Sequence, residues 1–258
     1  MIYKVISYFI FLLKSKNQHG VHSPFVYNLV TKCFYQKTNL KKTTYYSSIK
    51  NSLLNNDTNI SVTDYGAKSK VFRTENRSIK AIVKHVALST KRAQLLIRIS
   101  EYFSPKNVLE FGTSVGLSAS AISLGNPSST ITTLEGCPET AQIAKNQFDK
   151  FNLNNINVLV GEFDQSLSQL KINQPLDMVY FDGNHQKNAT LKYFEYCLQH
   201  IHNNSFFIFD DIYWNKQMIE AWEEIKAHPK VSVTIDTYQW GIVFFRKEQE
   251  KEHFTIRV

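Results

Sequence analysis

The sequence predicts an α/β fold built on a doubly wound, mostly parallel sheet of seven strands. From residue 107 onward, short apolar runs alternate with amphipathic stretches, as expected for strands buried on both faces and joined by helices. The last two β-rich runs, 231–236 and 241–246, are separated by only four residues. Such a link is too short for a parallel crossover, so we expect an antiparallel pair to close the sheet.

The other five predicted strands share a short length and a near-continuous apolar character. They occupy residues 108–111, 130–135, 156–161, 177–182 and 205–210. Helical patterns lie between them, at 115–124, 138–151, 164–170, 188–201 and 214–227. Residues 105–258 are therefore expected to form one α/β domain.

Residues 1–104 predict a helical N-terminal cap that covers the carboxyl edge of the sheet. Apolar residues recur at helical spacing from Pro24 to about Phe34 and again over 78–103. The second stretch is interrupted near Ser89, whose hydroxyl can cap the following half. The segment 36–70, rich in Asn, Ser, Thr and Lys, predicts loops.

The first residues predict an amphipathic helix. Their uninterrupted apolar run, Val5 to Leu13, is shorter than the roughly 20 residues that a membrane-spanning helix needs. Its apolar positions fall at helical spacing. The helix can pack on the body of the protein, pair with another subunit, or make peripheral membrane contact through residues 1–13.

Charge and cysteine content restrict the setting more than the function. The 258 residues carry a formal charge of +8, which is compatible with nucleic acid, an acidic membrane, an anionic substrate or simply a solvated basic surface. No long basic run favours one of these. Three widely separated cysteines do not form a disulfide framework, which favours a cytoplasmic protein.

A glycine turn follows the first predicted parallel strand. Gly112 permits a sharp exit from the strand, and Gly116 permits close approach of a ligand to the backbone before a helix N-terminus. The spacing G-x-x-x-G, with Glu110 two residues ahead, differs from the G-x-G-x-x-G that seats a pyrophosphate. Glu135, which ends the next strand, can accept ribose hydroxyls. These features together suit adenosine with an amino-acid tail.

These motifs resemble those of class I S-adenosylmethionine (SAM) methyltransferases. The resemblance covers residues 105–246 and rests on VLEFGTSVG, LEG at 134–136, GEFDQSL at 161–167 and MVYFDG at 178–183. It implies a Rossmann-like sheet that ends in antiparallel strands. It also implies a SAM-binding set of Glu110, Gly112, Thr113, Ser114, Gly116, Ser118, Glu135, Gly136, Glu162, Phe163 and Asp182.

Acidic residues and a histidine follow the fourth and fifth parallel strands. Asp182, Asp210 and Asp211 lie at neighbouring strand ends, where carboxylates can hold a hard cation such as Mg²⁺. The alternative is that the last two cap the next helix. The set resembles divalent-metal-dependent O-methyltransferases, although an Asp pair replaces the Asp-Asn of catechol-type members. Asp182-Gly183-Asn184-His185 resembles the D-G-x-H of sugar and macrolide enzymes, which implies His185 as the base.

O-methylation of a small molecule is therefore the leading hypothesis. The net charge keeps RNA methylation open, although the N/D-P-P-Y/F motif of adenine N-methylating enzymes is replaced by Asp182 to His185. A nicotinamide oxidoreductase and a non-catalytic binding module of the same fold are further alternatives. The N-terminal text KNQHGVHSPFVYNLVTKCFY resembles uncharacterised methyltransferase-like proteins of Bacteroidetes-type bacteria. Four polar residues of the cap can bind an anionic substrate or hold the cap in place: His19, His22, Arg73 and Arg77.

Overall fold

The structure, a computed structural model, describes residues 2–63, 65–66, 74–85 and 87–258. It comprises two compact units. The first unit consists of Met1–Tyr35 and Ile172–Val258, and the second consists of Gln36–Lys171. The boundary predicted between residues 104 and 105 stays a prediction.

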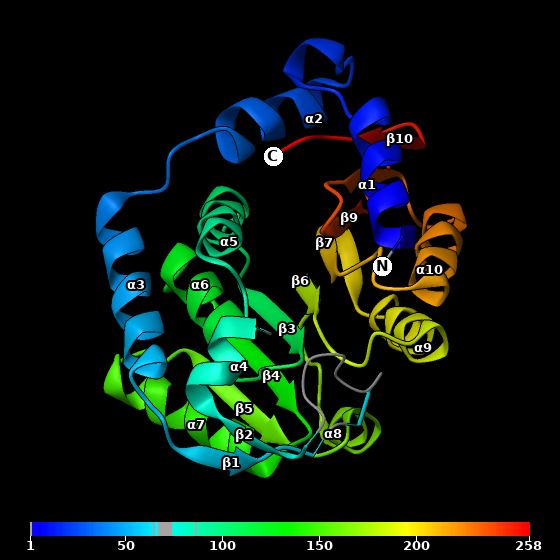
Figure 1. Ribbon diagram of the computed structural model, residues 1–258. Coiled ribbons are helices and arrows are strands. Elements are labelled where there is room, and N and C mark those ends of the chain that lie inside the picture. The colour runs from blue at the N-terminus through cyan, green and yellow to red at the C-terminus, as the bar shows by residue number, and fades with distance from the viewer. Residues whose placement is uncertain (1, 64, 67–73, 86) are drawn as a thin grey trace. The chain divides into compact units, whose positions relative to one another are not determined.

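Three parallel strands form the sheet of the second unit. β3 (Asn107–Phe111), β4 (Thr130–Glu135) and β5 (Ile156–Val160) lie side by side in that order, joined by α6 (Leu117–Gly125) and α7 (Pro138–Lys150) (Figure 1). Right-handed crossovers that proceed in one direction place both helices on the same face of these strands. The carboxyl ends of β3 and β4 therefore meet at one edge.

Three further helices of the second unit lie where the sequence predicts helices. α4 (Ile79–His85) and α5 (Thr90–Phe103) are separated where the break was expected, and the Ser89 hydroxyl accepts the Arg92 N–H at 3.3 Å. α8 is the short helix Phe163–Gln169.

The prediction of loops over 36–70 was wrong, because α3 (Leu40–Leu54) lies there. Its polar composition hides a narrow apolar stripe of Tyr46, Ile49 and Leu53, all buried. β1 (Asn59–Ser61) and β2 (Asn76–Ser78) form a further antiparallel pair that was not expected.

The first unit contains the strands that close the sheet. β6 (Leu176–Phe181) is parallel to β7 (Ile201–Asp210), and β9 (Trp240–Phe244) is antiparallel to both β7 and β8 (Val233–Asp236). The predicted antiparallel pair is therefore confirmed. β10 (Glu252–Thr255) adds a parallel strand beside β8. The main sheet of the described residues thus has eight strands, whereas the sequence predicted seven.

Two crossover helices and the N-terminal segment complete the first unit. α9 (Lys187–Cys197) and α10 (Lys216–Ala227) follow β6 and β7. The N-terminal segment contains α1 (Ile2–Lys14), the short helical turn η1 (Gln18–Gly20), α2 (Pro24–Leu29) and the short segment η2 (Val30–Phe34), in that order. Ser23 caps α2 by accepting the Val26 N–H at 3.4 Å.

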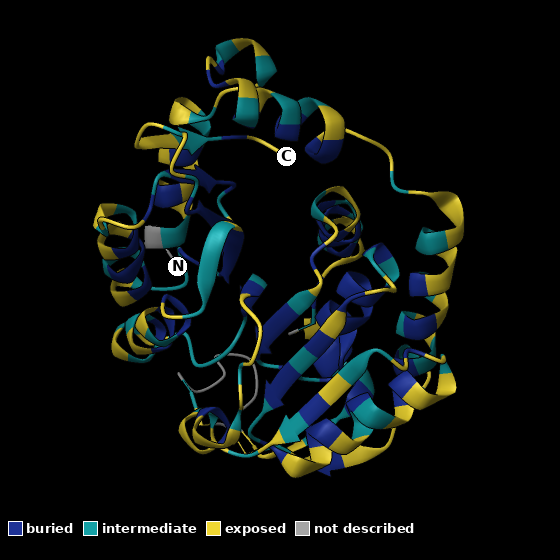
Figure 2. Cartoon of the chain, turned by 180° about the vertical axis from the view of Figure 1, so that it is seen from behind, coloured by how far each residue is buried: buried dark blue, intermediate teal, exposed yellow. Residues whose placement is uncertain are grey.

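Burial follows the pattern that parallel strands require. The inner strands β3, β6, β7, β8 and β9 are mostly buried, whereas the edge strands β5 and β10 carry exposed residues. Most helices carry exposed residues along one side, as Figure 2 shows. The cores are apolar and aromatic, with Phe111 in the second unit and Phe207, Phe209 and Trp240 in the first. In the described part of the chain, no helix is long and apolar enough to span a bilayer.

Candidate active site

The glycine turn after β3 adopts the backbone conformation that its sequence allows. Gly112 has φ 97° and Gly116 has φ 83°, a region that side chains with a Cβ rarely adopt. A Cβ on Gly116 would also lie 2.6 Å from the Phe148 ring of α7. Gly116 is therefore required by its backbone conformation and by close packing, and it places the N-terminus of α6 next to the turn.

Glu135 is held by backbone donors from two loops. Its Oε2 accepts the N–H of Ser114 at 2.8 Å, and its Oε1 accepts the N–H of Cys137 at 2.9 Å. Each carboxylate oxygen retains acceptor capacity beyond these bonds. The side chain is half-buried at the end of β4, where it can still receive hydroxyl donors from a ligand.

Glu110 lies fully buried beneath the turn. Its Oε2 accepts the Thr133 hydroxyl at 2.5 Å, and that hydroxyl is 2.6 Å from the hydroxyl of Thr113. Burial raises the pKa of Glu110 to about 7, although hydrogen bonds from the Ser118 and Thr133 side chains oppose the shift. Glu110 thus links the strand to the turn and to the first turn of α6.

A tyrosine from the N-terminal region lies against the other side of the Glu135 loop. The ring of Tyr65 occupies the space beside Gly136, where an added Cβ would be 2.7 Å from the ring. The strand that precedes this tyrosine is fixed nearby, because the Ser61 N–H donates to Glu139 at the start of α7 at 2.8 Å. Tyr65 was not among the predicted site residues, although a glycine directly after the acid was a signal for close approach.

Phe163 and Glu162 lie at the beginning of α8. The Phe163 ring packs edge-on against Phe111, with ring centroids 5.5 Å apart. Glu162 is exposed and precedes the helix as its cap residue. Gly161 connects them to the Glu135 loop through its N–H, which donates to the Glu135 carbonyl at 2.9 Å. The second unit therefore brings Glu110, Glu135 and Phe163 together around the strand ends.

In the first unit, Asp182 and His185 lie together after β6. The His185 Nε2 is 3.7 Å from Asp182 Oδ1, and both side chains are partly exposed. Asn184 and His185 have φ values of 70° and 46°, so two consecutive residues adopt the left-handed conformation. This backbone is unusual away from glycine and turns His185 back toward Asp182.

Trp214 and Lys4 complete this corner, and neither was a predicted site residue. The Trp214 ring centroid lies 6.0 Å from that of His185, and the Lys4 Nζ lies 3.8 Å from the Trp214 ring. Trp214 follows Asp211 in the loop after β7, and its N–H donates to the Asp211 carbonyl at 2.7 Å. The isolated lysine within an apolar helix was the signal in the sequence.

Asp210 ends β7, Asp211 follows it, and the chain itself engages the Asp210 side chain. Asp210 Oδ1 accepts the Asp211 N–H at 2.7 Å, and Oδ2 accepts the Tyr180 hydroxyl at 3.3 Å. Asp211 has φ 51°. Over the described residues, no group of three or more His, Cys, Asp or Glu side chains is arranged to hold a metal ion. The described side chains thus show no preformed cation site, and a metal held by Asp182, Asp210 and Asp211 stays a prediction.

The described polar residues of the cap belong to both units. His22 lines a cavity beside the C-terminal end of α1, and the Asn17 side chain caps the turn that contains His19. Arg77 donates to the Thr74 carbonyl at 3.2 Å in the second unit. Arg73 lies outside the described residues. Coverage of the sheet edge by residues 1–104 stays a prediction.

A protein-family model matches the part of the chain that holds the candidate site residues. Residues 109–212, which include the glycine turn, Glu135 and His185, match the family model described as a methyltransferase domain. This part of the chain is a methyltransferase domain. The methyltransferase class predicted from the glycine turn and the strand-end acid is therefore confirmed.

Solved structures similar to this methyltransferase include O-methyltransferases. One from Bacillus cereus, in complex with S-adenosylhomocysteine (SAH), is 23% identical with a TM-score of 0.55, and the match covers 63% of this chain and 84% of that one. TomG from Streptomyces achromogenes, in complex with SAM, is 17% identical with a TM-score of 0.55 and coverages of 62% and 82%. SAH-bound PaMTH1 from Podospora anserina is 13% identical with a TM-score of 0.61 and coverages of 88% and 97%.

Proposed function

We propose that this methyltransferase transfers a methyl group from SAM to an oxygen of a small molecule. The observation that carries the proposal is the Glu135 carboxylate, held by the Ser114 and Cys137 N–H groups beside the glycine turn. A fixed carboxylate next to a helix N-terminus suits a ligand with a ribose diol and an amino-acid carboxylate. Neighbours of the same fold, described above, were solved with SAM or SAH bound.

The residues of the second unit fit this ligand. Glu135 would accept the ribose hydroxyls, and the turn 112–116 with Ser118 would face the methionine part. Phe163 and Tyr65 would border the adenosine, since both rings lie beside the strand-end loops. The buried Glu110 would hold the turn in place through Thr133. When bound, SAM supplies an activated methyl group on a sulfonium.

The chain's own chemistry is proton removal from the acceptor. We propose that a neutral His185 imidazole takes the acceptor hydroxyl proton as the oxygen attacks the methyl carbon and the carbon–sulfur bond breaks. The proton remains on His185 until it is released to water. Asp182, whose Oδ1 is 3.7 Å from Nε2, would stabilise the imidazolium that forms. Trp214 would limit the orientations of the histidine ring.

A divalent cation such as Mg²⁺ is a separate part of the hypothesis. Both Asp210 oxygens accept hydrogen bonds from the chain, so we derive no step through a metal. Exhaustive chelation tests this part. Loss of turnover that Mg²⁺ restores would establish a metal role, whereas unchanged turnover would leave proton transfer to His185.

Calorimetry with SAH tests the proposed function directly. We expect binding at micromolar affinity, and formation of SAH from SAM when a panel of phenols and other small hydroxyl compounds is supplied. The absence of any SAH binding to the intact chain would refute the function. Binding without turnover on any hydroxyl acceptor would refute only the O-methylation.

A further inference from the structure

One side of α1 is apolar and faces solvent. Five large side chains line it at the i, i+3, i+4 spacing of one helix face. They are Val5, Ile6, Phe9, Ile10 and Leu13, of which Phe9 is 61% and Leu13 88% exposed. A monomeric protein rarely leaves such a contiguous apolar stripe in water without a use for it.

The opposite side of α1 is anchored to the first unit. Phe11 is only 4% exposed, and the Tyr8 ring packs edge-on against Tyr238, with centroids 4.9 Å apart. The Tyr238 hydroxyl donates to the Lys4 carbonyl at 2.8 Å. The helix is therefore fixed in place, and its apolar stripe is presented in a defined direction.

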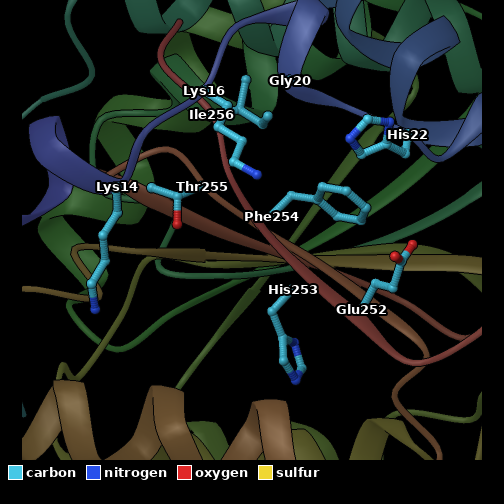
Figure 3. A pocket seen from close by; sticks show the side chains of 9 residues that line it. All are labelled: Lys14, Lys16, Gly20, His22, Glu252, His253, Phe254, Thr255 and Ile256. Atoms are coloured by element: carbon cyan, nitrogen blue, oxygen red, sulfur yellow. The ribbon is translucent and has the colours of Figure 1, made fainter.

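The end of α1 is also fixed, and it is basic. The Lys16 N–H donates to the Thr255 carbonyl of β10 at 2.8 Å. A cavity of about 270 Å³ opens beside this end and is lined by Lys14, Lys16 and His22, with Glu252 as its acidic residue. Figure 3 shows the Lys16 ammonium and the His22 ring on the same side of β10 as Phe254.

The charge of the chain is concentrated in the same part of the sequence. Residues 1–56 contain eight lysines and no acidic residue. The remainder of the chain contains as many acidic as basic residues. Of this segment, residues 1–35 belong to the same unit as α1, and they hold four of the lysines, Lys4, Lys14, Lys16 and Lys32. A surface of opposite charge is the partner that this distribution favours.

We propose that α1 docks the protein on an anionic lipid surface. The apolar stripe would enter the boundary between headgroups and acyl chains, and Lys14 and Lys16 would contact lipid phosphates. The helix is about 20 Å long by its 13 residues, which suits a helix lying in the plane of the surface. A second copy of the chain is disfavoured as the occupant. One short helix falls below the roughly 20–30 residues per side of a stable interface. In a symmetric pair, residues 1–35 of the second copy would also bring lysines and no acidic residue against Lys14 and Lys16.

Vesicle sedimentation of the full chain tests the docking. We expect binding to vesicles of 70% phosphatidylcholine and 30% phosphatidylglycerol, and at least tenfold weaker binding to pure phosphatidylcholine. Raising the salt to 0.5 M should weaken the binding to anionic vesicles. Failure of the wild-type chain to bind the anionic vesicles would overturn the proposal, as would equal binding to neutral ones.

Single substitutions locate the surface. Leu13→Ser should lower the vesicle partition coefficient severalfold, and the double variant Phe9→Ser/Leu13→Ser at least tenfold. Leu40→Ser is the matched control, because Leu40 is 77% exposed but lies on α3, and it should bind like the wild type. The double variant Lys14→Gln/Lys16→Gln should bind anionic vesicles more weakly than the wild type does, and its weak binding to neutral vesicles should not change. Unchanged vesicle binding in the apolar double variant would overturn the assignment to α1.

Two measurements separate this proposal from its alternatives. Calorimetry with SAH should give the same affinity for Phe9→Ser/Leu13→Ser as for the wild type, which shows that the variant is folded and separates docking from the methyltransferase function. Sedimentation velocity should give a monomer at micromolar concentration. A dimer that Leu13→Ser dissociates would overturn the lipid proposal in favour of a second copy.

Discussion

The strand ends of the two units hold their polar residues in different ways. In the second unit, Glu135 is fixed by two backbone N–H donors, and Glu110 is fixed by a chain of threonine hydroxyls. In the first unit, His185 lies 3.7 Å from Asp182 and beside the Trp214 ring. In the first arrangement, each carboxylate is held by hydrogen bonds from the chain. In the second, His185 is partly exposed beside Asp182 and Trp214, as the proposed proton acceptor must be to meet a ligand.

The two strand-end regions also differ in how far their surroundings can be predicted from the local sequence. The N–H groups that donate to Glu135 come from Ser114 and Cys137, which directly follow predicted strands, so their positions follow from those strands. The surroundings of His185 include Lys4, which is remote in the sequence and contacts Trp214. We expect substitutions in the first unit to change turnover and substitutions in the second to change cofactor affinity.

The largest effect is expected at His185. His185→Ala should lower kcat about 10²–10⁴-fold, because the acceptor proton loses its base. SAH affinity should stay within about twofold, which calorimetry measures. His200→Ala, a histidine of the same unit whose ring lies near Tyr196, is the control. Equal loss of SAH affinity and turnover would contradict the division of roles between the units.

The next effect concerns the cofactor. Glu135→Ala should weaken SAH binding by about 1.5–3 kcal/mol, roughly 10- to 150-fold, because it removes a charged acceptor. Glu135→Gln, which keeps one carbonyl oxygen, should lose less. Thermal unfolding distinguishes lost ligand contacts from a loosened turn. Wild-type affinity in Glu135→Ala would show that the ribose site lies elsewhere.

Because Glu110 is buried, we expect the free energy of unfolding of the second unit to depend on pH. With its pKa raised from 4.5 to about 7, the native carboxyl is protonated where the unfolded one is already ionised. The contribution of Glu110 to the free energy of unfolding is fully present below pH 4.5 and is lost as the pH rises through 7. The loss amounts to about 3 kcal/mol at most.

Glu110→Gln, which mimics the protonated acid, should remove this slope in urea unfolding between pH 5 and pH 8. The exposed Glu101→Gln should leave the slope unchanged. A Glu110→Gln protein with the wild-type slope would show that another group titrates.

The smallest effect is expected at Tyr65. Tyr65→Ala should weaken SAH binding about three- to tenfold, because one apolar wall of the adenosine site is removed. Tyr65→Phe should bind SAH like the wild type, since phenylalanine keeps the ring and lacks only the hydroxyl. Unchanged affinity in Tyr65→Ala would restrict Tyr65 to packing on Gly136.

The sequence by itself determined the alternation of strands and helices, the antiparallel closing pair and the methyltransferase class. Each depends on local information: apolar runs, a four-residue link, and a glycine turn whose conformation few other residues adopt. It also located Glu110 and Glu135 at strand ends. α3 was missed because its stripe of Tyr46, Ile49 and Leu53 is too narrow to stand out in a polar segment.

Only the tertiary structure decided which remote residues meet. The packing of Tyr65 on Gly136, the stacking of Lys4 on Trp214 and the addition of β10 beside β8 all join segments far apart in the chain. The same is true of Asp210, whose oxygens accept bonds from Tyr180 and the backbone. Strand-end position predicts that carboxylates are near one another, but the direction of each side chain depends on its hydrogen-bond partners, which sequence spacing does not specify.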